Sequence, residues 1–109
     1  MDDKKELITV VVQRKDADRA LDAALKAGAP GATFFYARGT GVRQRLGLLG
    51  MLIEEEKQVI LIVVPQGKAA AVLAALEKAV QLDQPGRGFA FVQTVDQVVG
   101  FYDGKGDPE

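Results

Sequence analysis

The aliphatic run from residue 59 to residue 64 constrains the fold more than any other part of the chain. It holds six consecutive branched residues, follows Gln58 and ends at Pro65. The run is too short for a typical helix, and its composition is typical of a strand that is buried on both faces. The sequence therefore predicts a strand over residues 58–64 near the centre of a sheet.

Three more strands and two helices are predicted around this run. β-branched and aromatic residues predict strands over residues 7–13, 32–37 and 89–95. Apolar residues at helical spacing predict helices over residues 16–27 and 69–80. Residues 97–102 fit either a short edge strand or a turn. The resulting order, β-α-β-β-α-β, predicts an α+β ferredoxin-like sandwich with both helices on one face of a four-stranded sheet.

Length and composition indicate a single domain over residues 1–109. The chain has 109 residues and is 48% hydrophobic, which is enough to bury a core. Polar and glycine-rich ends place the ordered core at about residues 6–102. The helices cover only one face of the predicted sheet. The apolar side chains of the other face can be buried if copies of the chain associate. We therefore expect a homo-oligomer.

Several residue types that carry chemistry are missing. The chain has no Cys, His or Ser, so it lacks soft metal ligands, common nucleophiles and the usual general base. A net charge of −1 disfavours a nucleic-acid surface. No apolar run is long enough to cross a bilayer. We expect a cytoplasmic protein without catalysis, bound metal, nucleic-acid partner or direct membrane insertion.

The connection between residues 38 and 57 is the main candidate functional segment, because loops of about 20 residues are usually functional or disordered. Its first part reads Arg38-Gly39-Thr40-Gly41-Val42-Arg43-Gln44-Arg45. Glycines let backbone N–H groups approach a ligand, and guanidinium groups bind phosphate oxygens. A second such loop, Gly86-Arg87-Gly88, precedes the last predicted strand. From spacing alone, these residues fit an anion site and ordinary solvated turns equally well.

An apolar segment follows the arginines in the same connection. It can pack against the oligomer or contact another protein, and we favour contact with a partner. The predicted partner-binding residues are Leu46, Leu48, Leu49, Met51, Leu52 and Ile53. The acidic run 54–56 that comes next is typical of a solvated surface rather than a metal site.

With these features in place, the chain resembles the PII nitrogen-regulatory signalling proteins over about residues 6–100. Three segments carry the resemblance, in order and spacing. Arg38-Gly39-Thr40-Gly41 is similar to the start of the family's T-loop, and residues 60–65 are similar to its central strand. Residues 86–92, which begin Gly86-Arg87-Gly88, are similar to the B-loop and the strand after it.

The resemblance implies a homotrimer whose lateral clefts bind an adenine nucleotide (AMP, ADP or ATP). The T-loop of one chain closes over the phosphates, and the B-loop of the neighbouring chain holds them. It also implies that the T-loop docks on a regulated protein, often a membrane transporter. The resemblance places Thr33 and residues 39–43 on the T-loop side of the cleft and residues 86–88 on the B-loop side. Together with the other loop arginines, the predicted ligand-binding residues are Thr33, Arg38, Gly39, Thr40, Gly41, Arg43, Arg45, Gly86, Arg87 and Gly88.

The sequence departs from the family in three respects. The lysine that follows the B-loop glycine in the family is Phe89 here, and the family's T-loop glutamine is replaced by Arg43 or displaced to Gln44. No tyrosine or serine lies between Gly39 and Lys57 to accept a uridylyl or phosphoryl group. Three alternatives stay open: an ACT-like metabolite sensor, a CutA-like trimer with a structural or metal-linked role, and a partner-binding trimer with an empty cleft.

Overall fold

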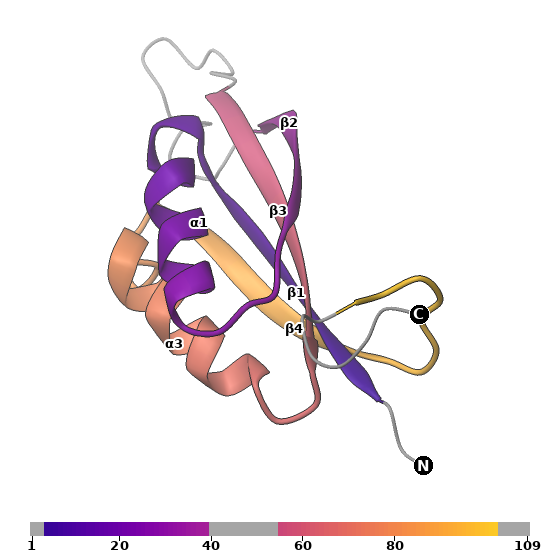
Figure 1. Ribbon diagram of the computed structural model, residues 1–109. Coiled ribbons are helices and arrows are strands. Elements are labelled where there is room, and N and C mark those ends of the chain that lie inside the picture. The colour runs from indigo at the N-terminus through magenta and orange to yellow at the C-terminus, as the bar shows by residue number, and fades with distance from the viewer. Residues whose placement is uncertain (1–3, 40–54, 103–109) are drawn as a thin grey trace, which may run out of the picture.

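The structure is a computed structural model that describes residues 4–39 and 55–102. Its elements are β1 (Lys5–Gln13), a 3₁₀ turn (Arg14–Asp16), α1 (Ala17–Lys26), β2 (Thr33–Gly39), β3 (Glu55–Pro65), α3 (Ala69–Val80) and β4 (Gly88–Val95). The four strands form one antiparallel sheet in the order β2-β3-β1-β4. Both helices lie on the same side of this sheet (Figure 1). The predicted α+β ferredoxin-like β-α-β-β-α-β fold is confirmed.

The hydrophobic core lies between the helices and the two inner strands. Alternate residues of β1 and β3 face the helices, because side chains of a strand point to opposite faces in turn. The fully buried strand residues are Ile8, Val10, Val12, Ile60, Ile62 and Val64. From the helices, Val72, Leu76 and Val80 of α3 and Ala17, Ala20 and Ala24 of α1 pack against them. The predicted central position of the 58–64 strand is therefore confirmed.

The hairpin of β2 and β3 extends further toward the 40–54 connection than the predicted strands do. Arg38 pairs with Glu56 and Gly39 pairs with Glu55 in the antiparallel register. Residues of opposite charge that lie directly across a ladder stabilise it. Glu56 is thus a strand residue, and its side chain is 68% exposed, as expected for a solvated charge. Glu54 lies outside the described residues. Residues 97–102 form bends without a strand, which agrees with the turn alternative.

One face of the sheet carries aromatic side chains without cover from the described part of the chain. Phe35, Val59, Val11 and Phe89 form one row across this face, because each is the register partner of the next. Phe35, Phe89 and Phe91 are each about half exposed. The rings of Phe89 and Phe91 stack with their centroids 6.3 Å apart. We call this aromatic surface the open face.

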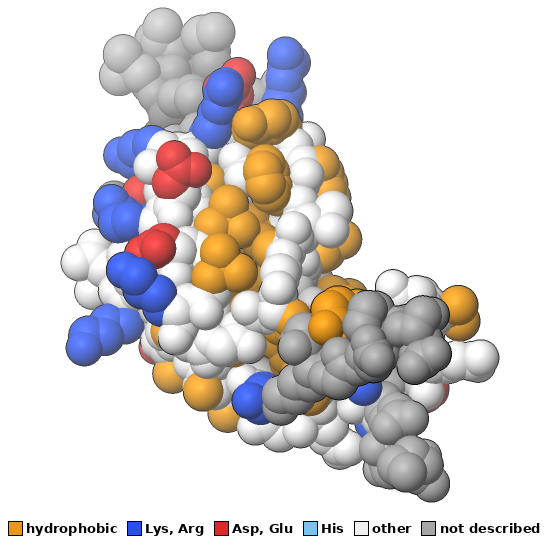
Figure 2. Space-filling model, in the orientation of Figure 1, with side chains coloured by type: hydrophobic (Ala, Val, Ile, Leu, Met, Phe, Trp, Pro, Cys, Tyr) orange, Lys and Arg blue, Asp and Glu red, His pale blue; other side chains and the backbone are white. Residues whose placement is uncertain are grey.

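Hydrophobic side chains also gather on the helix side, between α1 and β2 (Figure 2). On β2, Phe34 and Tyr36 alternate with the open-face residues and are exposed, as is Leu25 of α1. The edge strand β2 makes few contacts with the helices, so its residues on this side stay accessible.

Gly88, the first residue of β4, has a backbone that only glycine suits. Its φ is +131°, and a Cβ at this position would collide with the backbone of Val11. We expect Gly88→Ala to lower the free energy of unfolding by about 2–4 kcal/mol, because the strain and the clash both oppose the pairing of β1 with β4. Urea denaturation at matched protein concentration measures the loss.

Gly31→Ala is the control for this prediction. Nothing lies within 4 Å of a Cβ built at Gly31, so we expect a change below about 0.5 kcal/mol. Equal stability of Gly88→Ala and the wild type would contradict the prediction.

Candidate functional site

The two glycine- and arginine-bearing segments lie at the same end of the sheet but at opposite edges. Gly88 is in one row with Val12, Gln58 and Tyr36, and β2 runs on from Tyr36 to Gly39. Neighbouring strands are about 4.8 Å apart, so three spacings separate the two edges by about 14 Å. Within one chain, Arg38 and Gly39, the described residues of the first segment, therefore lie at the opposite edge of the sheet from Gly88.

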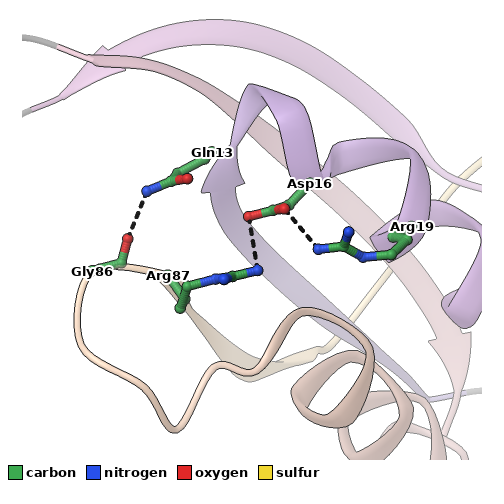
Figure 3. A network of polar contacts seen from close by, with 5 residues as sticks. All are labelled: Gln13, Asp16, Arg19, Gly86 and Arg87. Atoms are coloured by element: carbon green, nitrogen blue, oxygen red, sulfur yellow. Dashed lines mark hydrogen bonds and ion pairs between the residues drawn. The ribbon is translucent and has the colours of Figure 1, made fainter.

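The loop before β4, residues 84–88, is attached to the end of β1 and to the 3₁₀ turn (Figure 3). The amide Nε2 of Gln13 donates a hydrogen bond to the carbonyl oxygen of Gly86 at 2.9 Å. The backbone N–H of Arg87 donates to the carbonyl oxygen of Gln84 at 3.4 Å. Both Gly86 and Gly88 have positive φ angles, so this loop depends on glycine at two positions.

Arg87 points toward the start of α1, where its guanidinium meets a buried carboxylate (Figure 3). Its Nη2 atom lies 3.3 Å from Oδ2 of Asp16. The Asp16 side chain is 3% exposed and that of Arg87 is 27% exposed. Oδ1 of Asp16 accepts a hydrogen bond from Nη2 of Arg19 at 2.7 Å. A direct contact between Arg87 and a ligand phosphate stays a prediction.

Sequence reasoning missed Asp16, which it treated only as the start of a helix. Its partner Arg87 is far away in the sequence, and no local pattern signals an ion pair across such a distance. The helix itself begins one residue later, at Ala17, because Asp16 completes the 3₁₀ turn.

Arg38 borders a hollow at the base of the 40–54 connection. The hollow has a volume of about 320 Å³ and is also lined by Arg14, Tyr36 and Glu56. Nη1 of Arg14 donates to Oε1 of Glu56 at 2.8 Å, and its guanidinium lies 5.0 Å from the centroid of the Tyr36 ring. The hydrogen bond to Glu56 and the charge of Glu56 raise the pKa of Arg14 above its ordinary value.

Thr33 borders a different hollow, on the open face and also of about 320 Å³. Its wall is mostly apolar and comes from three other strand residues, from the segment 30–32 before β2 and from residues 101–102. Leu7, Leu61, Val63, Phe101 and Tyr102 are among the residues that line it. Phe101 is held near this position by a cation–π contact, in which Nζ of Lys5 lies 5.8 Å from the ring centroid. The hollow suits a flat apolar group with a polar edge near the Thr33 hydroxyl.

The remaining predicted residues lie outside the described residues. They are Thr40, Gly41, Arg43 and Arg45 of the ligand-binding set, and Leu46, Leu48, Leu49, Met51, Leu52 and Ile53 of the partner-binding set. Within residues 4–39 and 55–102, acidic side chains form no group of three that could hold a metal ion. No helix in this part of the chain has the length and hydrophobicity to span a membrane.

Solved structures of other proteins share this fold. B. subtilis GlnK, in a complex with ATP, is 21% identical, with 88% of this chain and 85% of that chain covered and a TM-score of 0.69. Arabidopsis thaliana PII, bound to citrate, is 23% identical, with coverage of 87% and 80% and a TM-score of 0.66. Comparison with curated proteins gave no match.

One protein-family model matches nearly all of the described residues. Residues 5–105 match the family described as nitrogen regulatory protein P-II. The match includes both glycine-bearing segments, all four strands and both helices. The chain therefore belongs to the nitrogen regulatory protein P-II family.

Proposed function

We propose that this P-II protein is a non-catalytic signalling protein whose homotrimer binds an adenine nucleotide in clefts between subunits. The observation that carries the proposal is the position of the two glycine- and arginine-bearing segments. They lie at the same end of the sheet and at opposite edges, about three strand spacings apart. A second copy of the chain is needed to bring a 38–39 segment and an 84–88 loop to one ligand.

The open face gives the copies a surface on which to associate. Its exposed phenylalanines, Phe35, Phe89 and Phe91, extend from one edge strand to the other. An apolar patch of this extent is typical of a protein interface. Phe89 also supports the open face as a subunit interface, because it places an apolar ring on this face at the position where the family has a charged lysine.

Each part of a nucleotide has a matching surface in this arrangement. The hollow beside Thr33 accepts the adenine base, and the side chains of Leu61 and Val63 pack against one flat face of the base. The phosphates bind the Gly39 segment of the same chain and the backbone N–H groups of Gly86 and Gly88 of the next chain, since consecutive N–H groups of glycine-rich loops form anion sites. The ATP of the B. subtilis GlnK complex supports this ligand class.

The 40–54 connection is the proposed contact with a regulated protein. Its sequence joins a basic first half, with Arg43 and Arg45, to the apolar segment 46–53. Ligand bound at the base of this connection changes its accessibility to a partner, so ligand and partner binding are coupled reciprocally. The proposed partner is a membrane transporter approached from the cytoplasm.

The oligomeric state tests the interface. We expect the wild-type chain to have three times its monomer mass of 11.7 kDa in light scattering at micromolar concentration. Phe91→Asp places a charge on the open face and should release monomers, because a charge buried at an apolar interface is costly. Leu25→Asp, at a half-exposed residue on the helix side, should keep the wild-type mass. A monomeric wild type would contradict the inter-subunit site.

The Thr33 hydroxyl tests the base site. Thr33→Val keeps the shape and strand propensity of the side chain but removes one hydrogen-bonding group. We expect ATP affinity, measured by isothermal titration calorimetry, to fall roughly threefold to tenfold. Thr94→Val is the matched control, because Thr94 is an exposed threonine of β4 outside the hollow. Equal affinities of the two variants would exclude Thr33 from the site.

Hydrogen exchange tests the connection as the responsive segment. We expect saturating ATP to change the protection of amides between residues 40 and 53, because ligand phosphates engage its first half. Amides of the α3 helix serve as the internal reference. Identical exchange with and without ATP, in a protein that binds ATP, would contradict a signalling role for this connection.

A further inference from the structure

We propose that Asp16 is a positioning residue for the phosphate-binding loop 84–88. Its carboxylate holds the guanidinium of Arg87, and this contact orients the backbone N–H groups of Gly86 and Gly88 toward the ligand. Arg87 then contributes to binding through the loop it holds in place and not through a contact of its guanidinium with phosphate. The inference rests on the proposed function and assigns a role within that same site.

Burial and charge make Asp16 a strong attachment point. A carboxylate that is 3% exposed needs opposite charge or hydrogen bonds to offset its lost hydration. Arg19, in the first turn of α1, supplies one partner. Arg87, in the loop before β4, supplies the other as an ion pair at 3.3 Å, and Oδ2 of Asp16 accepts no hydrogen bond from the described residues. The second contact is the one that attaches the loop.

Two further contacts fix the residues on either side of Arg87. The carbonyl oxygen of Gly86 accepts from Gln13, and the backbone of Gly88 lies so close to Val11 that no Cβ fits. The three consecutive residues 86–88 are thus all held against the end of β1 and the 3₁₀ turn. A preorganised anion site loses less conformational entropy when the ligand binds.

The two possible roles of Arg87 predict opposite effects of one substitution. If Arg87 binds phosphate directly, Asp16 competes for its guanidinium, and removing the carboxylate strengthens anion binding. If Arg87 holds the loop through Asp16, removing the carboxylate weakens anion binding. Asp16→Asn therefore decides between them, since asparagine keeps the shape of the side chain and removes its charge.

The experiment is a double-mutant cycle of Asp16→Asn and Arg87→Gln, with ADP and adenosine as probes in calorimetry. We expect each single variant to bind ADP roughly tenfold more weakly, and the double variant to bind it no more weakly than either. Adenosine, which has no phosphate, should bind all variants like the wild type. Stronger ADP binding by Asp16→Asn, additive losses, or an equal loss for adenosine would overturn the inference.

Asp22→Asn is the matched control. Asp22 forms an exposed ion pair with Lys26 at 3.0 Å within α1, and it lies six residues beyond Asp16 in the sequence. The Asp22→Asn variant should bind ADP with the affinity of the wild type. Thermal melting of every variant shows whether a loss of binding reflects unfolding.

Hydrogen exchange of the ligand-free protein provides a second readout. Amides of residues 84–88 should exchange faster in Asp16→Asn and Arg87→Gln than in the wild type and in Asp22→Asn. Unchanged exchange in a protein that binds ADP would overturn this inference alone. A wild type that binds neither ADP nor ATP would instead overturn the proposed function, and the positioning role with it.

Discussion

The antiparallel pairing of β1 with β3 is the constraint on which the rest of this structure depends. The register runs from Lys5 opposite Pro65 to Gln13 opposite Lys57, so it fixes which residues of both inner strands face the helices. A shift of β1 by one residue would turn Ile8, Val10 and Val12 out of the core and bury Thr9 and Val11 instead. The same register sets the open face and brings both glycine-bearing segments to one end of the sheet.

Much of this fold could be predicted from local patterns in the sequence. The aliphatic run 59–64 indicated a strand near the centre of the sheet, and the helical spacing of Ala20 and Ala24 indicated the buried side of α1. The ends of β2 and β3 were harder to predict. Arg38 and Glu56 are polar residues typical of a loop, and only their position opposite each other in the ladder makes them strand residues.

The candidate site was predictable as a set of segments but not as an arrangement. Glycine and arginine in the loop 86–88 indicated anion chemistry, yet the direction of the Arg87 side chain depends on Asp16. The ion pair of Arg14 with Glu56 likewise joins segments that are 42 residues apart. Such pairs depend on which elements the fold brings together, and composition carries no signal for them.

The junction between β1 and α1 has a consequence for communication between clefts. Gln13 and Asp16 contact the loop 84–88, while Arg14 contacts Glu56 and Tyr36 at the base of the other segment. Three residues of the stretch 13–16 therefore contact the two elements that are proposed to bind ligand. In the proposed ring, where each cleft takes one element from each of two chains, this short stretch of backbone connects neighbouring clefts. Cooperativity between the proposed nucleotide sites would then have a covalent route that avoids the hydrophobic core.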